Sequence, residues 1–278
     1  TPFFITWELA GKFPKILEDD VVGESARELF KDAKAMLDQW LSSNQLKASA
    51  VFGFWPAQSD GDDIVVFEDE TRQAERTRLH HLRQQTDKPN GKPNLCLSDF
   101  VAPTDVAADY IGGFVVTAGL GLDTLVAEFE DANDDYNAIM TKALGARFAE
   151  AMAEYTHKKV REWWGFGKTE NLSNSDLIKE KYQGIRPASG YPCQPDHTEK
   201  DTIWKLLDVK KEIGLELTES RAMNPGSSVS GLYFSNPDSK YFNVGKLGKD
   251  QVEDYAKRKN WPIEEALKWL RPNLGFDE

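Results

Sequence analysis

The strongest structural signal in this chain is the stretch DYNAIMTKALGARFAEAMAEYTHKKVREW, residues 135–163. Its apolar side chains recur every three to four residues, which is the period of a helix with one buried face. They are Tyr136, Met140, Leu144, Phe148, Met152, Tyr155 and Val160. The stretch therefore predicts one long central helix. The β-rich run IGGFVVT, residues 111–117, precedes it and predicts a buried strand that ends at Gly119 and Gly121.

Pairs of apolar runs around polar turns predict two hairpins. The runs at 50–55 and 64–67 flank a polar turn at 59–63. The runs at 231–234 and 241–244 flank an Asn-Pro-Asp turn signal. Because hairpins join antiparallel strands, both signals favour an antiparallel sheet.

Further helices are expected where apolar residues keep helical spacing, at 26–41, 176–181, 199–213, 250–259 and 263–270. Asp196 and Glu199 have the spacing of a capping box, and Gly214 marks a helix end. Only a short strand fits at 95–101. The mixed order predicts an α+β fold with a mostly antiparallel, twisted sheet and flanking helices, in a single domain over residues 1–278.

Composition excludes several classes of protein. The 34 Lys and Arg residues against 46 Asp and Glu residues give a net charge of −12, which excludes a nucleic-acid binder that works through bulk charge. No apolar run approaches the roughly 20 residues of a membrane span, so no membrane partner is expected. Two cysteines cannot form a disulfide framework, which favours the cytoplasm. Because the chain starts at Thr1 without a signal pattern, we expect it to be a fragment of a longer protein.

Common catalytic and metal motifs are weak in this chain. The four histidines and two cysteines lack metal-ligand spacing, so we expect no metal site. Cys193 and His197 are four residues apart, and a buried thiol is favoured over a catalytic thiol pair. The Gly119–Gly121 loop follows a strand as a nucleotide-binding or methyl-donor loop would, but Thr124 stands where a third glycine belongs. A simple turn is favoured there.

The segment YQGIRPASGYP, residues 182–192, is a stronger candidate for a binding site than these motifs. It combines prolines, which restrict the backbone, with glycines, which adopt conformations that other residues avoid. Such a segment follows a fixed, unusual backbone path that leaves peptide groups free to meet a ligand. Arg186 offers a fork that matches a carboxylate, and Tyr191 offers an aromatic face that attracts a sulfonium. A ligand-binding loop and a purely structural turn are equally compatible with this composition.

Here the sequence resembles a known family. The motif RPASGYP at 186–192, followed by PDHTEK at 195–200, is similar to the C-terminal activation domain of cobalamin-dependent methionine synthase, most closely the bacterial form. Matching blocks are spread in order along the chain: TPFF at 1–4, ILED at 16–19, HHLRQQ at 80–85, DFVAP at 99–103, DDYN at 134–137, SKY at 239–241 and QVEDYA at 251–256.

The resemblance implies a function. The chain would bind S-adenosylmethionine and supply its methyl group for the reductive methylation of inactive cob(II)alamin, which a neighbouring domain holds. The whole enzyme would be a methyltransferase of methionine biosynthesis, and the isolated domain would not turn over. Zinc would belong to another domain. Flavodoxin or a diflavin reductase would donate the electron, and the excised module would be a monomer.

The resemblance also implies the ligand-binding residues and no catalytic ones. Arg186 would hold the methionyl carboxylate, while backbone groups of the loop would line the adenosine and the sulfonium. The full set is Arg186, Ala188, Gly190, Tyr191, Tyr241, Phe242, Glu150 and Glu180, the two glutamates acting through water. The glutamates could instead be solvated helix charges, and Tyr241 and Phe242 could be cross-strand packing.

Two other functions compete with methyl donation. The chain could mainly be a docking module that recruits the electron donor and stabilises the reactivation conformation. Docking of an acidic partner needs a basic patch, either Arg72, Arg76, Arg78 and Arg83, or Lys257, Arg258 and Lys259. A free-standing methyltransferase that uses the Gly119 loop is disfavoured by the missing glycine.

Overall fold

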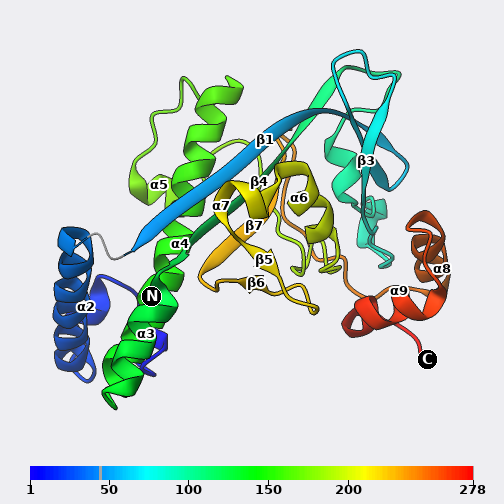
Figure 1. The fold of residues 1–278 in the computed structure, drawn as a ribbon. Helices are drawn as coiled ribbons and strands as arrows, with labels where there is room; N and C mark the ends of the chain where they lie inside the picture. The colour runs from blue at the N-terminus through cyan, green and yellow to red at the C-terminus, as the bar shows by residue number, and fades with distance from the viewer. Residues whose placement is uncertain (44–45, 278) are drawn as a thin grey trace. The chain divides into compact units, whose positions relative to one another are not determined.

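The computed structural model describes residues 1–43 and 46–277 (Figure 1). A five-stranded sheet has the strand order β3-β2-β1-β4-β7. The strands are β1 (Lys47–Asp60), β2 (Asp63–Phe67), β3 (Glu75–His80), β4 (Asp109–Leu120) and β7 (Ser228–Tyr233), and β5 (Glu216–Leu217) pairs with β6 (Met223–Asn224) in a small second sheet. The β1–β2 and β2–β3 ladders are antiparallel. The predicted α+β class with a mostly antiparallel sheet is confirmed.

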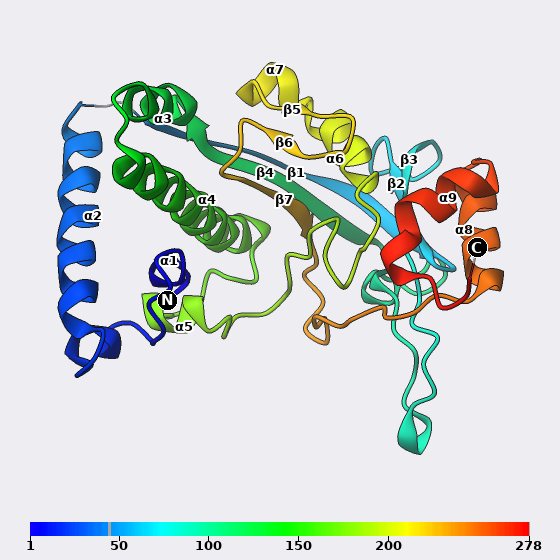
Figure 2. The same ribbon diagram turned by 90° about the horizontal axis from the view of Figure 1, so that it is seen from below.

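The helices of the structure have the following bounds: α1 (Pro2–Ile5), α2 (Gly23–Ser43), α3 (Leu122–Asp131), α4 (Asp135–Trp164), α5 (Asn174–Ile178), α6 (Glu199–Leu207), α7 (Val209–Ile213), α8 (Lys249–Arg258) and α9 (Ile263–Leu270). Short 3₁₀ turns lie at Lys15–Glu18, Pro89–Gly91 (η2), Leu97–Phe100 (η3) and Arg271–Asn273. The predicted long helix is confirmed as α4. The loop between β3 and η3 extends away from the sheet, with η2 at its tip (Figure 2).

The chain divides into two compact units. Unit 1 comprises Thr1–Ala50, Val116–Tyr155 and Asn224–Val229, and unit 2 comprises Val51–Val115, Thr156–Met223 and Ser230–Glu278. The single domain over 1–278 stays a prediction. Each unit buries its own apolar cluster, as the periodicity requires. In unit 1 that cluster includes one face of α2, with Ala26, Leu29, Ala33, Met36 and Trp40.

Packing accounts for both glycines of the Gly119–Gly121 loop in unit 1. A side chain at Gly119 would place its Cβ 2.1 Å from the carbonyl oxygen of Gly226. Gly121 has φ 88° and is the N-cap of α3, a left-handed conformation that glycine adopts without strain. Gly119 thus lies inside β4, and Gly121 makes the turn from β4 into α3, as the sequence favours.

The first hairpin is confirmed, with a tighter turn than predicted. Asp60 pairs with Asp63, so the loop holds only Gly61 and Asp62. Gly61 has φ 61°, as a two-residue hairpin turn requires. The strand β1 extends on both sides of the predicted run at 50–55, from Lys47 to Asp60.

Several sequence expectations are wrong. Residues 95–101 contain the turn η3 and no strand. Residues 241–244 form no strand, so the second hairpin does not exist. The helix over 199–213 is broken at Asp208, whose φ of 48° separates α6 from α7. Thr198, not Asp196, is the N-cap of α6, so the capping box is absent as well.

A buried histidine joins the end of β3 to the segment after the Arg186 loop. His81 Nδ1 lies 3.0 Å from Oε1 of Gln194, and Nε2 of Gln194 donates to the carbonyl of His80 at 2.7 Å. Because an amide oxygen only accepts, Nδ1 of His81 carries the hydrogen. Burial, which outweighs the hydrogen bond that His81 donates to Gln194, lowers the pKa of His81 from 6.5 to about 4.

This shift predicts a loss of stability in acid. Below pH 6.5 the unfolded chain protonates His81, whereas the folded chain does so only near pH 4. The free energy of unfolding should therefore fall as the pH drops through that window, by up to about 1.4 kcal/mol per pH unit from this residue. Urea unfolding between pH 7 and 4 measures the slope. His81→Asn keeps a donor without titrating and should flatten it; an unchanged slope would contradict the assignment.

Candidate functional site

The Arg186 loop runs along the end of β7, which is one of the two edge strands of the sheet. The Ile185 N–H donates to Phe234 O at 3.1 Å and the Phe234 N–H donates back at 3.0 Å. The Leu232 N–H donates to Pro187 O at 3.0 Å. A Cβ on Gly231 would lie 2.5 Å from that same proline oxygen, so only glycine permits this approach. The loop is thus clamped to the sheet on both sides of Arg186.

The second half of the loop is a closed turn. The Tyr191 N–H donates to Ala188 O at 3.3 Å, and the Gly190 N–H donates to Gln194 O at 2.7 Å. Gly190 has φ 91°, and a Cβ there would lie 2.1 Å from the His197 ring. Both the conformation and the space therefore require glycine at this position. The fixed backbone path that the composition predicts is what the structure has.

Three expected site residues meet at Arg186. The Arg186 N–H donates to the hydroxyl of Tyr241 at 3.0 Å. The pKa of Tyr241 is raised, chiefly because the hydroxyl is desolvated and further because the negative charge of Glu180 lies near it. Glu180 itself is exposed and has φ 51°. The structure thus places the Tyr241 hydroxyl on the Arg186 backbone, with the charges of Glu180 and Arg186 near that hydroxyl.

The thiol of Cys193 anchors Phe242. Its Sγ donates to Phe242 O at 2.9 Å and accepts from the Phe242 N–H at 3.1 Å. His197 Nδ1 lies instead 2.9 Å from Nζ of Lys200. The two groups therefore have different partners and form no nucleophilic pair. Burial raises the pKa of the Cys193 thiol, which further disfavours a thiolate.

The remaining expected residues lie at different degrees of exposure. Tyr191 is 64% exposed and Tyr241 is 45% exposed, so both rings present an aromatic face at the surface. Ala188 is half-buried in the turn. Glu150 is exposed on α4 within unit 1, whereas the other seven residues belong to unit 2. The ligand-binding roles of all eight stay predictions.

The PDHTEK motif forms a buried ionic cluster behind the loop. Nζ of Lys259 lies 2.8 Å from Oδ2 of Asp196 and 2.7 Å from Oε1 of Glu199. The Lys259 side chain is only 8% exposed, and both carboxylates are buried. Sequence reasoning missed this cluster because Lys259 is 60 residues after Glu199 and lies in what looks like an exposed basic run.

Carboxylates neutralise most of the two basic stretches. Arg78 pairs with Asp60 at 2.7 Å, and Arg83 pairs with Asp62 and Asp99, each at 2.7 Å. Lys259 belongs to the buried cluster, and Arg258 pairs with Asp63 and Asp254. Arg72 packs over the Tyr110 ring and donates to Ala57 O. Docking of an electron donor stays a prediction, with less free positive charge than the sequence suggests.

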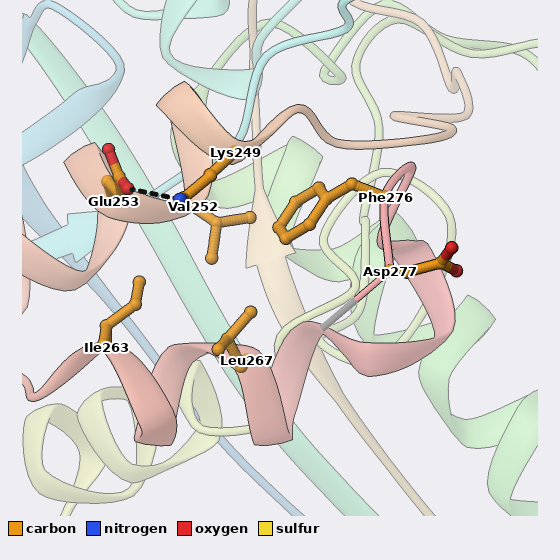
Figure 3. Close-up of a pocket in the computed structure, with 7 residues that line it drawn as sticks. All are labelled: Lys249, Val252, Glu253, Ile263, Leu267, Phe276 and Asp277. Atoms are coloured by element: carbon orange, nitrogen blue, oxygen red, sulfur yellow. Dashed lines mark ion pairs between the residues drawn. The ribbon is translucent and has the colours of Figure 1, made fainter.

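A separate hollow lies between α8 and α9 (Figure 3). Its walls are the apolar side chains of Val252, Ile263, Leu267 and Phe276, with Asp277 and the Lys249–Glu253 pair, 3.7 Å apart, beside them. It contains none of the expected site residues. Among the described residues, no cluster of three or more His, Cys, Asp or Glu side chains is arranged to hold a metal ion.

Comparison with known proteins adds two findings. Residues 1–260 match the family model described as "Vitamin B12 dependent methionine synthase, activation domain". The chain is also similar to a solved structure titled "Crystal Structure of the MetH Reactivation Domain bound to AdoHcy". The two share 58% sequence identity with a TM-score of 0.98, and the match covers 100% of this chain and 86% of that one. Both findings agree with the resemblance in the sequence motifs.

The turn at Gly190 makes a direct prediction. Gly190→Ala should lower the free energy of unfolding much more than Gly214→Ala, because only the first new methyl group meets another side chain. Gly214 has a similar positive φ of 73° with nothing within 4 Å, so it measures the cost of the left-handed backbone alone, roughly 1 kcal/mol. Urea unfolding compares the two variants; equal losses would show that the His197 contact does not constrain the turn.

Proposed function

The chain belongs to the family of vitamin B12-dependent methionine synthase activation domains, and on this premise we propose that it binds S-adenosylmethionine on the Arg186 loop. The methyl group would go to cobalamin held by another domain of the enzyme, after an external electron donor has supplied one electron to the inactive cob(II)alamin, and S-adenosylhomocysteine would leave. One observation carries the proposal: a reactivation domain that matches this whole chain at 58% identity is bound to AdoHcy, the demethylated form of that donor.

The chemistry of the loop suits this ligand. Arg186 presents a planar fork to a carboxylate, and such charge-assisted bidentate pairs are among the strong hydrogen bonds. The exposed faces of Tyr191 and Tyr241 suit a positively charged sulfonium. Because the loop is already clamped to β7, little conformational entropy is lost when a ligand binds.

The role of this chain in the reaction is positional. Cobalamin, when bound by its own domain, supplies the cobalt centre that accepts the methyl group. The residues of this chain bind the donor and orient its methyl group, and they transfer no proton. The family is part of a methyltransferase as a whole, and in our proposal this domain alone does not turn over.

No helix within residues 1–43 and 46–277 combines the length and the apolar character of a membrane span. The net charge of −12 also disfavours binding to an anionic membrane surface or to a nucleic acid.

Calorimetric titration with S-adenosylmethionine tests the proposal. Arg186→Ala should weaken binding at least about tenfold, because a charge-assisted contact contributes on the order of 1.5 to 3 kcal/mol. Arg186→Lys keeps the charge but loses the fork, so its affinity should be intermediate. Arg76→Ala removes an exposed arginine of β3 and serves as the control. If Arg186→Ala binds as tightly as the unmodified chain, the donor site lies elsewhere.

A further inference from the structure

A column of three stacked rings crosses unit 2 beneath the start of the Arg186 loop. Phe114 of β4 stacks on Tyr233 of β7, with centroids 4.4 Å apart and planes at 18°. Tyr233 stacks in turn on His157 of α4, with centroids 4.8 Å apart and planes at 18°. Ring contacts thereby join β4, β7 and α4.

Tyr182 continues this column into the loop. Its ring meets His157 edge to face, with centroids 4.8 Å apart and planes at 82°. The guanidinium carbon of Arg161 lies 3.9 Å from the centroid of the Tyr182 ring. Tyr182 is therefore held by two residues of α4, one helical turn apart.

Arg161 is an unusual residue for a helix end because its side chain has no exposed surface. Its Nε pairs with Glu170 at 3.0 Å. Its two terminal nitrogens are buried and find no hydrogen-bond acceptor among the described residues. A desolvated guanidinium is attracted most strongly to an aromatic face, so Tyr182 is a principal partner of this cation.

Arg186 lies close to the same group of residues. Burial, and then the positive charges of Arg161 and Arg186, hold the pKa of His157 well below its usual range. The imidazole is therefore neutral, and it packs against the rings of Tyr233 and Tyr182. The chain from Tyr182 to Arg186 is short, and its far end is fixed because Ile185 pairs with Phe234. Gly184 permits this path, since a Cβ there would lie 2.4 Å from Phe234 O.

We propose that Arg161 and Tyr182 are positioning residues that hold the near end of the loop and so set the place of the Arg186 guanidinium. The effect on ligand binding rests on the proposed function, whereas the effect on the loop itself does not. In this arrangement Arg161 touches no ligand. It acts through the Tyr182 ring, which covers its charge and fixes the backbone that leads to Arg186.

Ligand titration of the full chain tests the effect of Tyr182 on ligand binding. Tyr182→Leu keeps apolar volume but removes the face that Arg161 covers, and it should weaken S-adenosylhomocysteine binding about fivefold or more. Tyr182→Phe keeps the aromatic face and should therefore bind more tightly than Tyr182→Leu. With 5′-methylthioadenosine, which has no carboxylate for Arg186, Tyr182→Leu should bind normally. Equal weakening for both ligands would overturn the positioning role, because it would indicate general damage to the site.

A matched control is available in the same unit. Tyr110→Leu removes another tyrosine that packs against an arginine, since the guanidinium carbon of Arg72 lies 5.2 Å from the Tyr110 ring. Tyr110 bonds to Glu70 and lies at the start of β4. Its loss should leave both ligand affinities unchanged. If Tyr110→Leu weakens S-adenosylhomocysteine as much as Tyr182→Leu does, the proposal is wrong.

Hydrogen exchange of the ligand-free chain tests whether Tyr182 holds the loop in place. The amides of Ile185, Arg186, Gly190 and Tyr191 all donate hydrogen bonds in the structure. Tyr182→Leu should speed exchange of the Ile185 and Arg186 amides at least about tenfold, and by more than Tyr182→Phe does, because phenylalanine keeps the aromatic face. If the unmodified chain binds no S-adenosylhomocysteine, the proposed function fails, and exchange still decides the positioning role. Unchanged exchange in Tyr182→Leu would overturn it.

Discussion

A lysine ammonium buried between two carboxylates is the interaction on which the structure of unit 2 depends. Removing each charge from water costs several kcal/mol, so such a cluster persists only where hydrogen bonds satisfy every member. The Tyr255 hydroxyl donates to Asp196 at 2.7 Å, and the His80 N–H donates to Glu199 at 3.1 Å. Lys259 donates to both carboxylates. Loss of the ammonium would leave two buried carboxylates unpaired, which is why the end of β3, the start of α6 and the end of α8 must stay together.

This cluster fixes the far end of the Arg186 loop. Asp196 and Glu199 bracket His197, whose ring packs directly against Gly190. The carbonyl of Gln194, two residues before Asp196, receives the Gly190 N–H. A shift of the ionic cluster would therefore move the turn that follows Arg186. The ring column around Tyr182 acts at the opposite end, so the loop is held between one electrostatic and one aromatic support.

These supports also explain how much the sequence could predict. Long local patterns were sufficient for α4, because its buried face repeats along 30 residues. The strand β3 was not predicted, since ERTRLH buries only Leu79 and is otherwise polar or charged. Residues 241–244 looked like a strand, yet the backbone of Phe242 bonds to the Cys193 thiol, 49 residues away. Periodicity reports which face of an element is buried; it cannot report a partner so distant along the chain.

In the candidate site, too, the sequence predicted some features and missed others. The glycines and prolines around Arg186 predicted a fixed backbone path, and hydrogen bonds to β7 provide it. Tyr182 and Arg161 carried no such signal, because an arginine at a helix end normally points to water. A loop that presents backbone groups to a ligand has few side chains with which to set its own shape. Its geometry must then come from residues that touch no ligand, and those residues are identified by their burial and contacts rather than by any motif.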